Sequence, residues 1–214
     1  YRTHCAQCHG ENRLGGIGPA LLPESLERLR KPEALKVIRE GRVATQMPAF
    51  GEQLGEDEAR QLAAWIYRPV TPSPSWDEAA IRQSQVVHAE TLALPAQPGA
   101  GLQGADPLNL FVVVETGDHH VSIIDGDRLE RLFRFPSRYA LHGGPKFSPD
   151  GRFVYFASRD GWISKFDLYH LVVVAEIRAG LNTRNAAVSS DGKWLLVANY
   201  LPHNLVVLDA AELS

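Results

Sequence analysis

The sequence of 214 residues has few sulfur-bearing side chains and no long apolar segment. It contains two cysteines and one methionine, so a zinc site with four cysteine ligands is excluded. No apolar run approaches the roughly 18 residues that a membrane-spanning helix needs. The net charge is −3, and because no basic block is present, nucleic acid is not a predicted partner. The composition, 44% hydrophobic and 22% charged, is that of an ordinary globular protein with one large domain or two smaller ones.

Both cysteines lie in one short motif near the start of the chain, Cys5-Ala6-Gln7-Cys8-His9. This pattern is typical of a covalently attached c-type haem, in which two thiols form thioether bonds and the histidine ligates the iron. A thioredoxin-like redox pair needs a βαβ context, which the surrounding residues do not indicate. Half of a zinc site would need a second cysteine pair. We therefore interpret Cys5 and Cys8 as haem c attachment sites and His9 as an iron ligand.

The single methionine, Met47, is the candidate for the second axial ligand of that iron. Methionine most often fills gaps in a core. Met47, however, lies in a proline-containing loop between two helical patterns, as the axial methionine does in class I cytochromes c. A thioether ligand raises the potential of haem iron. The turn-rich residues 15–19 follow the haem motif, and Pro19 lies where such domains contact the proximal histidine.

Residues 1–68 are predicted to form an all-α, class I c-type cytochrome domain. Helix candidates lie at residues 23–29 and 31–40, the second with Pro32 in its first turn and Gly41 after its last. A third begins at the acidic residues 56–58, since acidic side chains favour a helix N-terminus. Residues 69–107 contain six prolines and one helical patch at residues 76–87. Such a segment is predicted to be an extended linker.

From residue 108 onward the apolar pattern alternates, which indicates β-strands. Aspartates follow apolar strands at intervals of 42 residues, at Asp125, Asp167 and Asp209. The segment Phe-Ser-Pro-Asp-Gly-Arg at residues 147–152 recurs in similar form at residues 188–193. A four-stranded unit with Asp-Gly hairpins and such a period is typical of a β-propeller blade. Strands are expected at residues 111–114, 121–124, 153–156, 162–166, 172–177, 195–198 and 205–208.

Residues 108–214 hold roughly two and a half such blades, whereas a propeller closes with about four to eight. An open stack of blades would expose unpaired strand edges, which natural proteins avoid. We therefore predict a multidomain protein in which the cytochrome domain precedes the first blades of an all-β propeller. The chain is expected to be truncated, with further blades outside it.

A c-type cytochrome, a proline-rich linker and a propeller together resemble the cytochrome cd1 nitrite reductase family, whose eight-bladed propeller holds haem d1. The most specific match is the run Arg138-Tyr139-Ala140-Leu141-His142. In that family a Tyr-Ala-x-His run carries the proximal ligand of the haem d1 iron, and the resemblance assigns this role to His142. Residues 148–152 and 158–161 continue the match.

The resemblance also implies which residues line the haem d1 pocket. Haem d1 carries several carboxylates, which the guanidinium fork of arginine binds well. Arg159 and Arg184 match family arginines that contact haem d1, and Arg138 is a further candidate. Tyr200 lies where the family has a pocket tyrosine. The alternatives are that the arginines are solvated loop charges and that Tyr200 belongs to the core.

Two features differ from the nitrite reductases and resemble the dihydro-haem d1 dehydrogenase branch of the family. Only 38 residues separate His9 from Met47, and Gly143-Gly144 follows His142. The resemblance implies a periplasmic oxidoreductase of haem d1 biosynthesis. It would oxidise a propionate side chain of dihydro-haem d1 to acrylate, with electrons leaving through the covalent haem c. The catalytic acid and base groups are expected in later blades, outside this chain.

Two other functions stay open from the sequence. A nitrite reductase would use both haems to make nitric oxide, and a non-catalytic haem d1 carrier would transfer the tetrapyrrole or electrons without changing it. Expected partners are the haem d1 precursor, a nitrite reductase or other proteins of the haem d1 pathway, and a soluble periplasmic electron acceptor. Because c-type haem is attached outside the bacterial cytoplasm and no signal peptide is present, we expect a processed chain in the periplasm.

Overall fold

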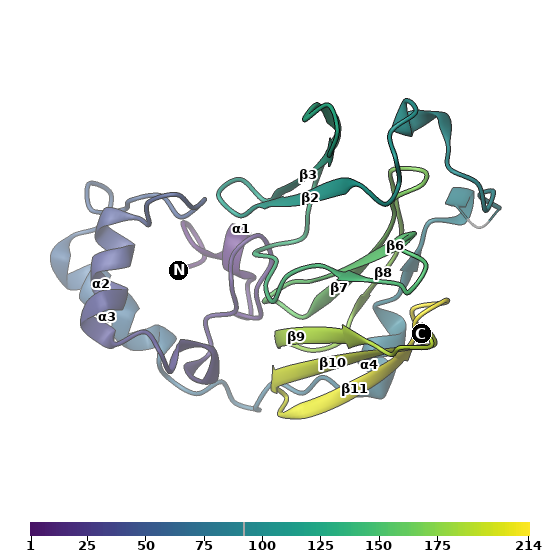
Figure 1. The fold of residues 1–214 in the computed structure, drawn as a ribbon. Helices are drawn as coiled ribbons and strands as arrows, with labels where there is room; N and C mark the ends of the chain where they lie inside the picture. The colour runs from purple at the N-terminus through teal and green to yellow at the C-terminus, as the bar shows by residue number, and fades with distance from the viewer. Residues whose placement is uncertain (92) are drawn as a thin grey trace. The chain divides into compact units, whose positions relative to one another are not determined.

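The computed structural model describes residues 1–91 and 93–214 and divides into two compact units (Figure 1). Unit 1 comprises Tyr1–Ser75 with Thr116–Asp118, and unit 2 comprises Trp76–Glu115 with His119–Ser214. None of the described helices is both long enough and apolar enough to cross a membrane. This division into two units does not test the domain boundaries predicted at residues 68 and 107, which stay predictions.

The described elements of unit 1 are helices joined by loops. Helix α2 has Pro32 in its first turn and ends at Gly41, whose φ of 73° lies in the left-handed region. Helix α3 begins with three acidic residues, and Glu58 accepts a hydrogen bond from the N–H of Gly55 at 2.9 Å. The helices are α1 (Ala6–His9), the 3-10 turn η1 (Pro23–Leu26), α2 (Lys31–Glu40) and α3 (Glu56–Ile66).

Helices α2 and α3 pack through small side chains. Ala34 of α2 and both Ala59 and Ala63 of α3 are at most 4% exposed, and Ile38 of α2 is buried beside Ala59 and Ala63. Small residues let helix backbones approach closely. Ile66, at the end of α3, is buried with Leu26 and Ala34. This packing fixes the C-terminal end of α3, to which the loop after the haem motif is attached.

The segment predicted as a linker contains ordered elements that join unit 2. These are α4 (Glu78–Gln83), β1 (Val86–Val87), η2 (Ala89–Thr91) and η3 (Ala100–Leu102). The helical patch expected over residues 76–87 is therefore wrong at its end, where Val86 and Val87 form a strand that pairs with β8. Ser84 ends the helix by donating its hydroxyl to the carbonyl of Ile81, and β-branched valines favour the strand that follows.

Three antiparallel sheets follow one another along unit 2 (Figure 1). Their strand orders are β2-β3-β4, β1-β8-β7-β6-β5 and β11-β10-β9. All seven predicted strands are present, whereas β4, β5 and β9 were not predicted. The strands are β2 (Leu110–Glu115), β3 (His120–Asp125), β4 (Arg131–Pro136), β5 (Lys146–Phe147), β6 (Phe153–Ala157), β7 (Trp162–Asp167), β8 (Val172–Arg178), β9 (Asn182–Val188), β10 (Trp194–Leu201) and β11 (Asn204–Asp209).

The middle sheet is buried on both faces. Val154 and Phe156 of β6 lie in a core shared with the first sheet, whereas Tyr155 and Ala157 lie in a core shared with the third. This alternation follows from the two-residue period of a strand. Phe166 of β7 is fully buried and stacks on a phenylalanine of β4 with ring centroids 4.4 Å apart. Each such buried side chain contributes about 1.5–3 kcal/mol, so the three sheets are held as one stack.

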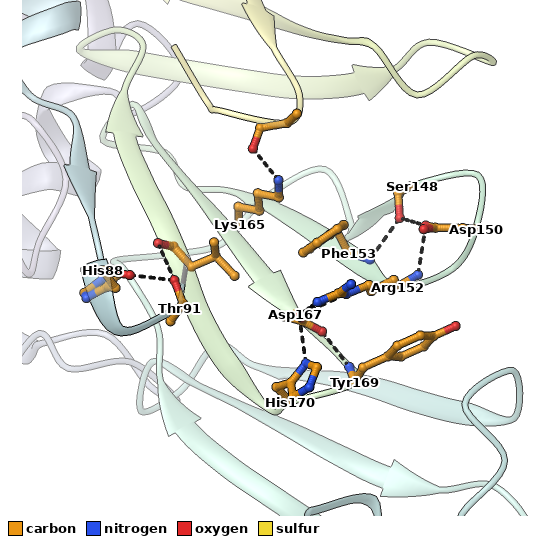
Figure 2. Close-up of polar contacts among 12 residues, drawn as sticks. His88, Thr91, Ser148, Asp150, Arg152, Phe153, Lys165, Asp167, Tyr169 and His170 are labelled. Carbon is orange, nitrogen blue, oxygen red and sulfur yellow. Dashed lines mark hydrogen bonds and ion pairs between the residues drawn. The ribbon is translucent and has the colours of Figure 1, made fainter. Parts of the chain in front are cut away.

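The repeated sequence motifs make the same hydrogen bonds in both copies. Asp150 and Asp191 each accept from the serine hydroxyl two residues earlier and from the N–H two residues later. Each serine also accepts from the N–H five residues after it. The turn glycines, Gly151 and Gly192, both have φ of 73°. The repeat in the sequence is therefore a repeated turn that joins neighbouring strands, and Figure 2 shows its first copy.

The aspartates spaced by 42 residues also share a role, because each accepts backbone N–H groups of the turn that follows its strand. Asp167 additionally contacts Arg152 Nη2 at 2.7 Å and His170 Nδ1 at 3.1 Å, with its own side chain 1% exposed (Figure 2). Nearby, the buried Lys165 donates to the carbonyl oxygens of Ala210 and Ala211 at 3.1 and 2.6 Å. These last contacts join β7 of the middle sheet to the turn after β11.

The substitution Asp167→Asn tests how much the ion pair between Asp167 and Arg152 stabilises the middle sheet. It leaves the largely buried Arg152 without its counter-ion, and we expect the free energy of unfolding of unit 2 to fall by about 3 kcal/mol in urea denaturation. The matched control is Asp209→Asn at the equivalent position, where the carboxylate accepts from backbone N–H groups that asparagine also satisfies. It should cost less than about 1 kcal/mol. Equal losses in both variants would contradict this account.

Candidate functional site

Helix α1 positions the ring of His9, its last residue. His9 is 7% exposed, and its Nδ1 lies 2.7 Å from the carbonyl oxygen of Pro19, which confirms the predicted contact with Pro19. Because a carbonyl oxygen only accepts, Nδ1 carries the proton and Nε2 keeps its lone pair. Burial lowers the pKa of His9 and so favours the neutral ring. A neutral imidazole with an available Nε2 is the form that ligates iron.

The loop after the haem motif lies directly against this imidazole. A Cβ atom at Gly18 would lie 2.7 Å from His9 Cε1, and one at Gly16 would lie 3.0 Å from the carbonyl oxygen of Cys8. The contact at Gly18 is too short for any side chain, and the contact at Gly16 is tighter than most, so the loop favours glycine at both positions. The sequence predicted a turn here but not its close approach to the ring.

Arg13 attaches the same loop to the end of α3, a role that the sequence did not predict. The residue is 5% exposed, and its guanidinium donates to the carbonyl oxygens of Trp65, Ile66 and Arg68 at 3.2, 3.1 and 2.9 Å. It also lies 4.6 Å from the centroid of the Trp65 ring. A cation at a helix C-terminus is stabilised by the helix dipole. No local pattern distinguishes this arginine from a solvated loop charge.

Met47 lies in a loop whose backbone is held by short contacts. Its carbonyl oxygen accepts from the N–H of Arg42 at 3.1 Å, and its own N–H donates to Thr45 Oγ1 at 3.2 Å. A Cβ atom at Gly41 would lie 2.8 Å from the Met47 carbonyl oxygen, so the glycine that ends α2 also lets this loop close. Met47 is half-buried. Its role as an iron ligand stays a prediction.

The residues around α1 fit a covalent haem better than a metal ion held by protein ligands alone. Both cysteines are free thiols, Cys5 buried and Cys8 partly buried. Within residues 1–91 and 93–214, no group of three histidine, cysteine or acidic side chains is arranged to hold a metal ion. Two thiols beside one imidazole with an available Nε2 supply what a c-type haem requires.

In unit 2, the backbone around His142 is held in an uncommon conformation. Ala140 has a φ of 32°, and Gly143 and Gly144 have φ of 85° and 73°. The N–H of His142 donates to the carbonyl of Ala157 at the end of β6, at 2.7 Å. The positive φ of Ala140 is costly for a residue with a side chain and needs support from its surroundings, whereas glycine adopts such a φ readily. This geometry directs the His142 side chain toward the start of β9.

The imidazole of His142 makes two contacts with a single residue, Arg184 of β9. Its Nδ1 lies 3.0 Å from the Arg184 carbonyl oxygen, and its Nε2 lies 3.2 Å from Arg184 Nη1. A carbonyl only accepts and a guanidinium only donates, so Nδ1 carries the proton and Nε2 accepts. The ring is therefore a neutral tautomer with its lone pair on Nε2, as an iron ligand requires.

An irregularity between β9 and β10 brings Arg184 and Tyr200 together. The register passes from Ala198↔Asn185 to Asn199↔Thr183 and then to Leu201↔Asn182. Arg184 and Tyr200 are thus the extra residues of two adjacent bulges, which re-aim side chains. The guanidinium of Arg184 lies 5.9 Å from the centroid of the Tyr200 ring, and Tyr200 is 39% exposed.

Gly143 is packed against Asn185, which the sequence did not single out. A Cβ atom at Gly143 would lie 2.3 Å from Asn185 Oδ1, and its φ is left-handed, so glycine is required there. A Cβ atom at Gly144, in contrast, would have no described atom within 4 Å. Gly143 is therefore required by packing against Asn185, whereas Gly144 faces open space.

The other two predicted arginines differ in their partners. Arg159 is exposed, and its N–H donates to the carbonyl of Ala140, which places it beside the His142 segment. In the described part of the chain its guanidinium has no hydrogen bond or ion pair. Arg138 instead forks onto Glu176 at 2.8 and 2.7 Å and lies 4.0 Å from the Trp162 ring centroid. Its charge is matched within the chain, and its contact with a tetrapyrrole stays a prediction.

We refer to His142, Arg159, Arg184 and Tyr200 as the His142 cluster. It combines an imidazole with an accepting Nε2, two exposed guanidinium groups and an exposed aromatic ring. This set of groups fits an iron tetrapyrrole with carboxylate side chains. A surface hollow of about 510 Å³ in unit 1, lined by Arg39, Glu40, Ala49, Gly51, Glu52 and Gln53, contains none of the predicted site residues.

Comparisons with known proteins match both parts of the chain. A family described as "Cytochrome D1 heme domain" matches residues 105–214, and one described as "Cytochrome C oxidase, cbb3-type, subunit III" matches residues 1–66. The predicted fold class is confirmed at the level of a c-type cytochrome part followed by a mostly β haem d1 part. Both predicted cofactors, haem c and a haem d1 species, are supported by these matches and by the relatives below.

A dihydro-heme d1 dehydrogenase from Pseudomonas aeruginosa is 62% identical over 214 residues, which cover 100% of this chain and 43% of that protein. A nitrite reductase from Stutzerimonas stutzeri is 26% identical over 238 residues, covering 100% of this chain and 41% of the reductase. The solved structure described as dihydro-heme d1 dehydrogenase NirN in complex with DHE superposes with a TM-score of 0.89 at 62% identity, covering 100% of this chain and 46% of that one. This chain spans less than half the length of these relatives.

The resemblance to the cytochrome cd1 family that the sequence predicted is confirmed by these matches. The haem d1 match covers the sheets that carry the His142 cluster, and the cytochrome match covers the helices that carry the haem motif. The chain belongs to the cytochrome D1 heme domain family.

Proposed function

We propose that the protein containing this chain is a dihydro-haem d1 dehydrogenase, an oxidoreductase of haem d1 biosynthesis. The observation that carries this proposal is the 62% identity to a named dihydro-heme d1 dehydrogenase over the whole length of this chain. The substrate would be dihydro-haem d1. Oxidation of one propionate side chain to acrylate removes two electrons and two protons and leaves the carbon skeleton unchanged.

In this proposal, the residues of unit 1 hold the electron acceptor. Cys5 and Cys8 would form the two thioether bonds, and His9, through Nε2, and Met47 would ligate the iron. When bound, haem c supplies a one-electron acceptor that can be reoxidised by a soluble partner. The contacts of His9 with Pro19 and Gly18 keep its ring from rotating, and the Arg13 contacts hold that loop on α3.

In unit 2, the His142 cluster would hold the substrate. His142 would ligate the tetrapyrrole iron through Nε2 while its Nδ1 donates to the carbonyl of Arg184. Arg159 and Arg184 would pair with carboxylates of the substrate, and Tyr200 would contact the edge of the ring system. Arg138 would also line the pocket, with its guanidinium held by Glu176. The groups that accept the two protons would come from parts of the protein outside this chain.

The finer fold and cellular context belong to the same proposal. Unit 1 would be an all-α class I cytochrome, and the three sheets of unit 2 would be the first blades of an eight-bladed propeller. Their repeated Asp-Gly turns support this interpretation. A protein with covalent haem c would function in the periplasm. Its partners would be the precursor tetrapyrrole, other proteins of the haem d1 pathway and a soluble electron acceptor.

A nitrite reductase is the second candidate, because a named nitrite reductase is 26% identical over the whole chain. The lower identity favours the dehydrogenase. The His142 cluster suits either activity, since both need an iron tetrapyrrole held near haem c.

The two activities, and a carrier without activity, are separated by one experiment on the full protein. We load it with dihydro-haem d1, add an oxidant, and measure the mass of the extracted tetrapyrrole. The dehydrogenase should yield a product lighter by two hydrogen atoms, together with transient reduction of haem c. An unchanged mass with nitrite turnover would establish the reductase instead. An unchanged mass without turnover would leave a carrier.

The substitution His142→Ala tests the predicted iron ligand. We expect the affinity for dihydro-haem d1 to fall by at least about 100-fold, because loss of an orienting partner of a metal ligand alone costs 10–100-fold. The measurement is an absorption titration, in which the unchanged haem c spectrum serves as the internal control. Added imidazole should restore the ligand spectrum. If the variant binds the tetrapyrrole with the spectrum of the unmodified protein, His142 is not the ligand.

A further inference from the structure

The contact between His142 and Arg184 uses both the backbone and the side chain of the arginine. The carbonyl oxygen of Arg184 accepts from Nδ1, and the guanidinium of the same residue donates to Nε2. The two contacts have different consequences. The first orients the imidazole, whereas the second covers the nitrogen lone pair that an iron ligand must offer.

Because the lone pair of Nε2 lies in the plane of the ring, it can bind either Arg184 Nη1 or a metal, but not both. Ligation therefore requires the guanidinium to move away. The carbonyl of Arg184 does not have to follow, since it is a main-chain group at a bulge of β9 and is separate from the side chain that moves. The imidazole thus remains oriented while its Nε2 becomes uncovered. A bound metal replaces one partner of the pair and leaves the guanidinium without an acceptor.

The guanidinium of Arg184 is not held by a carboxylate of the described residues. Within the described residues, Arg184 forms no ion pair, and its side chain is exposed. Arg159, on the neighbouring segment, likewise lacks a carboxylate partner among the described residues. Arg138 shows the contrasting case, since Glu176 already binds its guanidinium with two hydrogen bonds. A carboxylate of the ligand could therefore pair with Arg184 without displacing an acidic partner in the described part of the chain.

We propose that Arg184 is a loading latch, which keeps His142 Nε2 covered until a ligand offers a metal to the imidazole and a carboxylate to the guanidinium. This proposal rests on the proposed function and extends it to substrate selection. A ligand that offers only a metal binds Nε2 but leaves the guanidinium of Arg184 without an acceptor. A ligand that offers both a metal and a carboxylate replaces the hydrogen bond between Arg184 and Nε2 with two contacts, one to Nε2 and one to the guanidinium. The latch thereby favours metallated tetrapyrroles with an anionic side chain on the His142 face.

The first test needs no tetrapyrrole. Diethyl pyrocarbonate modifies neutral imidazole nitrogen, and peptide mass mapping at pH 8 reports the rate at His142 alone. We expect Arg184→Ala to raise this rate about threefold to tenfold, the range that corresponds to one modest hydrogen bond. The matched control is Arg159→Ala, which removes an exposed arginine of the same cluster that does not contact His142. It should leave the rate unchanged. Equal rates in Arg184→Ala and the unmodified protein would overturn the proposal.

The second test uses two probes, dihydro-haem d1 and its methyl-esterified form, titrated into the full protein. For the free carboxylate form, Arg184→Ala should bind more weakly than the unmodified protein, because the new ion pair is lost. For the ester, the same variant should bind about threefold to tenfold more tightly, because no latch has to open. Arg159→Ala should bind the carboxylate form more weakly and the ester unchanged.

A loss of affinity in Arg184→Ala for both probes would show that the arginine is a plain contact residue and would overturn the latch. This result is distinguishable from failure of the proposed function. The modification rate depends on the contact between Arg184 and His142 and not on the reaction that the protein performs. A latch that passes both tests in a protein that does not oxidise dihydro-haem d1 would instead belong to a reductase or a carrier.

Discussion

The central constraint in this chain is a hydrogen bond from imidazole Nδ1 to a backbone carbonyl, which occurs at both candidate iron ligands. His9 donates to Pro19 at 2.7 Å, and His142 donates to Arg184 at 3.0 Å. Each bond fixes the tautomer and the rotation of the ring, so that Nε2 keeps its lone pair in a defined direction. The two sites lie in unrelated folds, yet both use the backbone rather than a carboxylate to orient the ligand. The structure around each site holds the accepting carbonyl, that of Pro19 or that of Arg184, in place.

In unit 1, that task falls to a glycine-rich loop that Arg13 attaches to the end of α3. In unit 2, the carbonyl belongs to a bulge between β9 and β10, and Ala186 and Val197 of these strands are buried in the core that the middle and third sheets share. The ion pair of Asp167 with Arg152 stabilises the middle sheet, and the contacts of Lys165 join that sheet to the turn after β11 (Figure 2). Stability of the stack and geometry of the site are therefore linked. A distortion of β9 or β10 would change the positions of Arg184 and Tyr200.

The sequence predicted the features that arise from local pattern. The alternating apolar residues of β6 and β7 and the Asp-Gly turns were recognisable because period and turn chemistry act over a few residues. Strand β9 was not predicted, because its outward positions are polar and its bulge interrupts the alternation. Val86 and Val87 were assigned to a helix, since two valines fit either pattern until a partner strand is known. The resemblance supplied His142, Arg184 and Tyr200 as candidates. The contact between His142 and Arg184 depends on packing between residues 42 positions apart, which no local pattern contains.

The tautomer of His142 is the most direct measure of this account. Nitrogen-15 spectra of the histidine-labelled protein, with haem c reduced and no second tetrapyrrole bound, distinguish protonated from unprotonated ring nitrogens. The account predicts that His142 carries its proton on Nδ1 and that Nε2 shows the shift of an unprotonated nitrogen. A proton on Nε2, the tautomer that free histidine prefers in water, would contradict it.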